Sequence, residues 1–168
     1  SAFDYFTVNE NSHDPPFDDA VGVNGPKALR QEATFINQNF SQQVLAHQSK
    51  YKFKTRNPFQ TGSERVASVG YKYQKWGVEN YTVYCRSEID SVARVKDSKK
   101  PAFVMIRALN EYDPKVTGDW RKQLENQRGS VLASETNNNN FKMTKWLASA
   151  LIAGVDQICL GYVCRLTP

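Results

Sequence analysis

The sequence predicts an α/β fold in which mixed β-sheets are flanked by helices. Several segments are rich in β-branched and aromatic residues and alternate or run apolar, which is typical of strands. Between them lie segments whose apolar residues recur at every third or fourth position, which is typical of amphipathic helices. Strands interleaved with helices favour helices packed on a sheet. The length of 168 residues suits one domain, and such a chain buries roughly 70% of its unfolded surface.

The first predicted element is a helix over residues 26–46. Pro26 suits the first turn of a helix, and Asn24 or Gly25 precedes it as a cap. Apolar residues then recur at helical spacing, at Leu29, Ala33, Ile36, Phe40 and Val44. The opposite face is polar but barely charged, which is unusual for a plain solvent-exposed surface: Arg30, Thr34, Asn37, Gln38 and Gln42.

Three strands and a short helix are predicted next. Residues 66–76 alternate and are rich in β-branched and aromatic side chains, so they predict a strand. Residues 81–89 and 102–109 carry further strand patterns and are joined through a basic connection. Residues 119–128 have the pattern of a short amphipathic helix that ends at Gly129.

The last part of the chain predicts a strand, a helix and a final strand. Residues 131–136 predict a short strand, and the four asparagines that follow predict a turn or a helix cap. Apolar residues from Trp146 to Leu151 recur at helical spacing, so they predict a helix that Gly154 caps. Residues 157–165 are mostly apolar and predict a buried strand.

Composition excludes several classes of protein. No stretch approaches the roughly 20 unbroken apolar residues of a membrane span. We expect no cleavable secretory signal, because residues 1–5 include Asp4 and no basic residue. Three irregularly spaced cysteines argue against a disulfide framework and favour a reducing, cytoplasmic location. With two histidines and no paired cysteine spacing, we expect no structural zinc site.

The charge is divided unevenly along the chain. Residues 1–26 hold five acidic and no basic residues, a net charge of −5. Residues 27–168 hold all 22 basic residues against 12 acidic ones, a net charge of +10. A basic body of this kind is typical of a nucleic-acid-binding protein, and a solvated surface with a chance asymmetry is the alternative.

Two carboxylates at the end of a predicted strand have a spacing that suits the binding of a divalent cation. Glu88 and Asp90 are two residues apart, so on a strand both would face the same side. The next strand carries Met105 and Arg107, where a nuclease would use Glu and Lys to hold metal and phosphate. Exposed carboxylates on strands are common, so a solvated surface pair is the alternative.

Longer motifs make the chain resemble a known family. It resembles the d subunit of eukaryotic translation initiation factor three, and the resemblance covers essentially the whole chain. The motifs are EATFINQNFSQQ (32–43), NPF (57–59), VASVGYKYQKW (66–76), LNEYD (109–113), DWRKQLENQRGSVLASE (119–135) and KWLASALIAG (145–154).

The resemblance implies that residues 1–168 form part of a single mRNA cap-binding domain, which in the family extends further at both ends. The implied function is translation initiation in the cytoplasm. The implied partners are the capped mRNA 5′ end, other subunits of the initiation factor and the small ribosomal subunit. No cofactor and no membrane are implied.

The fold of that domain is similar to that of the eukaryotic decapping exonucleases, and the comparison implies a degenerate active site. Two of the four metal-binding carboxylates are missing, so the resemblance implies no bound metal and no enzyme activity. The positions concerned are Gln74 and Met105, where the enzymes have Glu; Glu88 and Asp90, which are kept; and Ser149, where they have Gln.

A nuclease channel without catalysis would still bind single-stranded RNA. Cations would contact phosphates, and aromatic rings would stack on bases. A methylated guanine cap adds a cation that favours an aromatic face. Uncharged groups of the first helix would contact bases or sugars, or would instead bond to a neighbouring loop. The predicted contact residues are Thr34, Asn37, Gln38, Lys72, Trp76, Arg107 and Lys145.

The acidic segment 9–26 matches an insertion of the family relative to the nucleases. We interpret it as a lid that competes with RNA phosphates for the basic channel. Two alternatives for the whole chain stay open. One is an active metal-dependent decapping enzyme or 5′ exonuclease, and the other is a protein-interaction scaffold in the initiation factor complex.

Overall fold

A computed structural model describes residues 22, 25–55, 57–58, 62, 69–96, 98, 100–111 and 113–164. Most of the predicted acidic lid, residues 9–21 and 23–24, lies outside these. The α/β class is confirmed. The elements are α1 (Pro26–Gln43), β1 (Gly70–Val78), β2 (Tyr81–Ile89), β3 (Ser91–Ala93), β4 (Ala102–Asn110), α2 (Pro114–Thr117), α3 (Trp120–Asn126), α4 (Arg128–Asn138), α5 (Asn140–Ala153) and β5 (Gln157–Val163).

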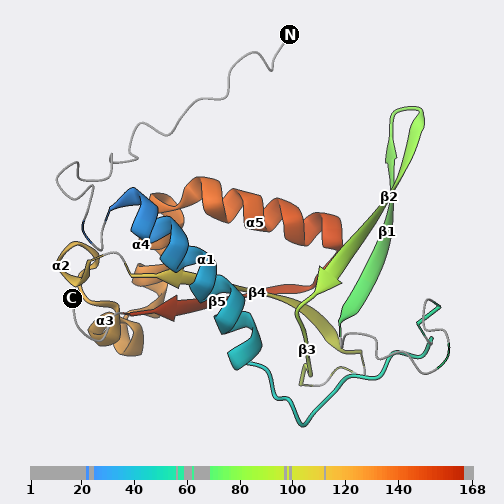
Figure 1. Cartoon of the computed structure of the whole chain (residues 1–168), viewed down its shortest axis with the longest axis horizontal. Coiled ribbons are helices and arrows are strands. Elements are labelled where there is room, and N and C mark those ends of the chain that lie inside the picture. The colour runs from blue at the N-terminus through green and yellow to red at the C-terminus, as the bar shows by residue number, and fades with distance from the viewer. Residues whose placement is uncertain are drawn as a thin grey trace.

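The described strands form two sheets. β1 and β2 make an antiparallel hairpin, whose far end projects away from the helices (Figure 1). The second sheet has β4 in the centre, with β3 antiparallel on one side and β5 parallel on the other. A parallel neighbour requires a crossover, which the helices α2 to α5 supply between β4 and β5.

The core is built on the central strand β4. Most of its side chains are buried, which is expected of a central strand covered on both faces. Met105 packs against Ala150 and Ala153 of α5. Leu109 packs in a second cluster with Trp120 and Val131. These two clusters fix α5 and the short helices relative to the sheet.

The strand predicted over residues 131–136 is wrong, because this segment belongs to helix α4. The β-branched Val131 and Thr136 suggested a strand. The buried positions of α4 are Val131 and Glu135, and they are four residues apart, which is a helical spacing. Packing of Val131 against Trp120 and Leu109 outweighs the weak local preference for a strand.

Other predicted boundaries agree closely. Gly25 is the N-cap of α1, and α1 ends at Gln43, three residues before the predicted end. The predicted helix 119–128 is α3, which ends earlier because α4 follows it directly. Gly154 ends α5 with a φ of +62°, as expected of a left-handed C-cap.

The last strand β5 is less buried than predicted. It lies at the edge of its sheet, with Gln157 and Cys159 exposed and only Gly161 fully buried among its residues. Within the described part of the chain, no helix has the length and apolar character needed to cross a membrane.

We predict that Gly161→Ala destabilises the fold. An added Cβ at this position would overlap the Phe40 ring of α1, so the helix would have to shift from the sheet. Overpacking of this kind costs about 1–3 kcal/mol of the free energy of unfolding. Thermal unfolding measures the change. Gly129→Ala is the matched control, because nothing lies within 4 Å of a Cβ there; equal melting temperatures for the two variants would contradict the prediction.

Candidate nucleic-acid interface

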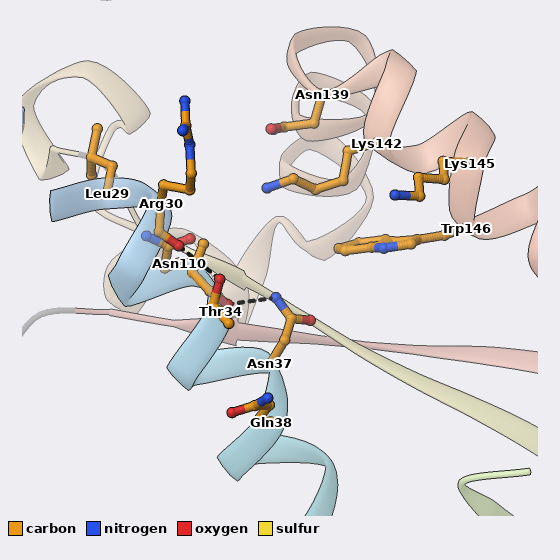
Figure 2. Close-up of a pocket in the computed structure, with 11 residues that line it drawn as sticks. Leu29, Arg30, Thr34, Asn37, Gln38, Asn110, Asn139, Lys142, Lys145 and Trp146 are labelled. Atoms are coloured by element: carbon orange, nitrogen blue, oxygen red, sulfur yellow. Dashed lines mark hydrogen bonds between the residues drawn. The ribbon is translucent and has the colours of Figure 1, made fainter. Parts of the chain in front are cut away.

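A groove of about 780 Å³ lies between α1 and α5 (Figure 2). Four of the seven predicted contact residues line it: Thr34, Asn37, Gln38 and Lys145. Lys72, Trp76 and Arg107 are not among its lining residues. The full lining is Leu29, Arg30, Ala33, Thr34, Asn37, Gln38, Asn110, Asn139, Lys142, Lys145 and Trp146.

Helical spacing places these side chains on one face of α1 and one face of α5, which form the two walls of the groove. Thr34, Asn37 and Gln38 lie at positions i, i+3 and i+4, so they share one face of α1. Lys142, Lys145 and Trp146 repeat this spacing on α5. Figure 2 shows the Lys142 side chain extending from α5 toward α1, above the Trp146 ring. The two helix faces therefore oppose each other across the groove.

Asn37 joins its groove wall to the central strand. Its Nδ2 donates to the carbonyl of Ala33 at 2.9 Å, and its Oδ1 accepts from the backbone N–H of Ala108 at 3.0 Å. Thr34 Oγ1 donates to the Arg30 carbonyl within α1. Asn37 therefore has a structural role, and its partner is strand β4, whereas the sequence suggested a neighbouring loop. Gln38 is exposed at the groove.

The groove has no negative charge among its lining residues. Arg30, Lys142 and Lys145 are cationic, and the remaining polar side chains are amides and one hydroxyl. The Lys142 ammonium lies 5.9 Å from the centre of the Trp146 ring, which is within cation–π range. Such a surface attracts anions, because no carboxylate of the lining neutralises it.

A buried carboxylate lies behind this wall. Glu135 of α4 is 6% exposed, and Asn139 donates a hydrogen bond to it. Burial raises the pKa of Glu135, while hydrogen bonds from Trp120 and Asn139 oppose that shift. Burial lowers the pKa of Lys142, and the Glu135 carboxylate opposes it. Glu135 thus helps to keep a partly desolvated lysine charged at the groove.

Sequence reasoning missed Lys142, Asn110 and Asn139. Lys142 could have been found from its spacing, because it precedes Lys145 by three residues and Trp146 by four. Asn110 is the last residue of β4, and Asn139 joins α4 to α5. Their position at the groove depends on packing between elements far apart in the sequence, for which the sequence gives no local signal.

The two carboxylates of the predicted nuclease pattern have different surroundings. Asp90 follows the end of β2, so it is not on one strand with Glu88 as expected. Asp90 Oδ2 accepts from Arg107 Nη1 at 2.9 Å and from the Ile106 backbone N–H at 2.7 Å. Glu88 is exposed. Asp90 and Arg107 of the predicted pattern therefore lie together, but they form an ion pair with each other.

Lys72, a predicted RNA contact, and the other positions of the predicted nuclease pattern also have contacts within the protein. Lys72 Nζ donates to the Gly154 carbonyl and lies 5.1 Å from the centre of the Phe103 ring. Gln74 also lies beside Gly154. Met105 is buried in the core, and Ser149 Oγ donates to the Lys145 carbonyl at 2.8 Å. Among the described residues, no three His, Cys, Asp or Glu side chains gather as a metal site would require.

The structure thus defines an α/β protein with a cationic, amide-lined groove between two helices. The chain belongs to the family of eukaryotic translation initiation factor 3 subunit 7 (eIF-3), whose family model matches residues 1–168. The resemblance seen in the sequence motifs is therefore confirmed at the level of the family.

Named relatives agree with this family. The proteins named as the D-1 subunit of eukaryotic translation initiation factor 3 from Drosophila grimshawi and Drosophila melanogaster are each 48% identical to this chain over 174 aligned residues. The match covers 99% of this chain and 31% of each relative. The chain therefore spans less than half of the length of these relatives.

We predict that Asn37→Ala lowers the free energy of unfolding by about 1–3 kcal/mol, because it leaves the buried N–H of Ala108 without its acceptor. Chemical denaturation measures the change. Gln38→Ala, on the same face of α1 but exposed, serves as the control and should stay within about 0.5 kcal/mol of the parent. An Asn37 variant as stable as the Gln38 variant would show that the bond to β4 contributes nothing.

Proposed function

We propose that this chain is the RNA-contacting part of a translation initiation factor subunit, and that it binds the capped 5′ end of mRNA and the adjacent single strand in the groove between α1 and α5. The observation that carries the proposal is the lining of that groove, which combines three cations, four amides and an indole with no carboxylate. The family relationship supports a role in translation initiation.

The groove residues suit the parts of a capped RNA. Arg30, Lys142 and Lys145 would contact the triphosphate, since charge-assisted hydrogen bonds to phosphate are the strong ones. The Gln38 amide, and the Asn37 N–H that does not bond to Ala33, would contact base edges or ribose hydroxyls, which uncharged donors and acceptors recognise. Trp146 offers a face for the cationic methylated guanine.

Lys142 and the cap would compete for the same ring. The Lys142 ammonium already lies over the Trp146 indole at 5.9 Å. A cationic base that stacks there would displace it, and the freed ammonium would turn to the phosphates of the same ligand. The methylated base would therefore take the place of Lys142 at the Trp146 ring, and Lys142 would pair with the phosphates.

The relationship to the family also supports the proposed partners. Other subunits of the initiation factor and the small ribosomal subunit are proposed as partners, and the cytoplasm as the location. The acidic segment 9–26 stays a prediction, as a lid whose carboxylates would compete with RNA for Arg30, Lys142 and Lys145.

We predict that a Gln38→Glu, Lys145→Glu double variant of the full-length subunit loses at least about tenfold in affinity for capped RNA, because carboxylates would repel the phosphates. Cross-linking to capped RNA, competed by a cap analogue, measures the loss. Lys27→Glu is the charge-reversal control, since Lys27 is exposed on α1 and does not line the groove. Equal competition curves for both variants would refute the groove as the cap site.

We further propose that the nuclease-like positions are inactive. A divalent cation needs several oxygen ligands, whereas Asp90 is bonded to Arg107 and to Ile106, and Met105 is part of the core. The thioether of Met105 is also a poor ligand for a hard cation. These residues do not fit a catalytic metal, so no metal-bound hydroxide would form there.

We predict no cleavage when the full-length subunit is incubated with capped or uncapped 5′-labelled RNA and manganese. Denaturing gel electrophoresis measures the products. The matched control is the Glu88→Ala variant, which should behave as the parent does. Metal-dependent cleavage by the parent that disappears in Glu88→Ala would contradict the proposal and favour the active nuclease.

A further inference from the structure

The β1–β2 hairpin has two chemically different faces. Residues directly opposite each other in an antiparallel pair point to the same side, and Tyr73 pairs with Arg86 while Lys75 pairs with Tyr84. Alternation along β1 adds Tyr71 to this side. We call this side the tyrosine face; it carries Tyr71, Tyr73, Lys75, Tyr84 and Arg86, and also Glu88 opposite Tyr71.

The tyrosine face is exposed along its whole length. The exposed fractions of its rings are 45% for Tyr71, 59% for Tyr73 and 71% for Tyr84. Lys75 and Arg86 are exposed as well, and the Arg86 guanidinium lies 5.0 Å from the centre of the Tyr71 ring. Two cross-strand pairs, Tyr73 with Arg86 and Lys75 with Tyr84, therefore place a ring beside a cation on a surface that no described part of the chain covers.

The opposite face of the hairpin has another character. At its base, Lys72 and Gln74 approach Gly154 at the end of α5. Toward the tip this face carries the uncharged side chains Trp76, Val78, Tyr81 and Val83, so it lacks the cations of the tyrosine face. Because Lys72 and Gln74 of this face contact the end of α5, the tyrosine face points away from that helix.

Aromatic rings that lie beside cations match one class of ligand. Single-stranded RNA offers bases that stack on aromatic side chains and phosphates that attract Lys and Arg. Tyr73 and Tyr84 are diagonal neighbours across the two strands, about 7–8 Å apart, so each can meet a separate base. Glu88 lies opposite Tyr71 at the base of the hairpin, so the part of the face that suits phosphates is the part nearer the tip, with Tyr73, Lys75, Tyr84 and Arg86.

We propose that the tyrosine face is a second contact surface for single-stranded RNA, separate from the groove. The inference rests on the proposed function only in taking RNA as the ligand, and it requires no recognition of the cap. Tyr73 and Tyr84 stack on bases, and Lys75 and Arg86 neutralise the phosphates between them.

The test uses the full-length subunit and a short, unstructured, uncapped RNA in a fluorescence anisotropy titration. The Tyr73→Ala, Tyr84→Ala double variant should lose at least about fivefold in affinity, the lower end of what one stacked base contributes. Replacing both with Phe should keep the affinity, because the rings remain. The Lys75→Gln, Arg86→Gln variant should also reduce the salt dependence of log K by about 0.7 for each lost phosphate contact.

Tyr81→Ala is the matched control, since Tyr81 is 73% exposed on the opposite face of the same hairpin. Parent-like affinity in the Tyr73→Ala, Tyr84→Ala variant overturns the proposal. So does loss of a protein partner from the assembled complex by that variant without any loss of RNA binding. The RNA in these titrations has no cap. If the groove variants showed that the proposed cap site is wrong, the result for the tyrosine face would still stand.

Discussion

The structure depends on how the open edge of the central strand β4 is satisfied. β3 pairs with β4 only over residues 102–104, and among the described strands none continues that edge. Backbone N–H groups that are buried without an acceptor are costly. Here the Asp90 carboxylate accepts from Ile106, and the Asn37 amide accepts from Ala108. Two side chains from different elements thus replace a missing strand, and they fix α1 and the end of β2 to the sheet.

This edge also occupies Asp90 and Arg107, two positions of the predicted nuclease pattern. A carboxylate that serves a metal must direct its oxygens to the ion, whereas Asp90 directs one oxygen to both the strand edge and Arg107. The arginine gains charge pairing in a half-buried setting, so separating the two would leave an uncompensated charge. The pair therefore acts as a structural bridge between the end of β2 and the central strand.

The sequence predicts the elements with strong periodicity and misses what tertiary contacts decide. The boundaries of β2 and β4 and the cap at Gly154 follow from local patterns. The helix α4 does not, because Val131 is drawn into a core that only the folded chain assembles. Four of the residues predicted as RNA contacts, Thr34, Asn37, Gln38 and Lys145, line one groove, whereas the pairing of Asp90 with Arg107 crosses 17 positions and leaves no trace in spacing.

Helix α5 connects the two surfaces that carry the proposals. Lys142, Lys145 and Trp146 line the groove from its first half, while the Gly154 carbonyl at its C-terminal end accepts from Lys72 of the hairpin. A cation at that end is favoured by the helix dipole. With 14 residues α5 is about 21 Å long, so the groove and the base of the hairpin are held at opposite ends of one rigid element. An RNA that contacted both would therefore span a fixed distance, and each contact would raise the effective concentration of the RNA at the other.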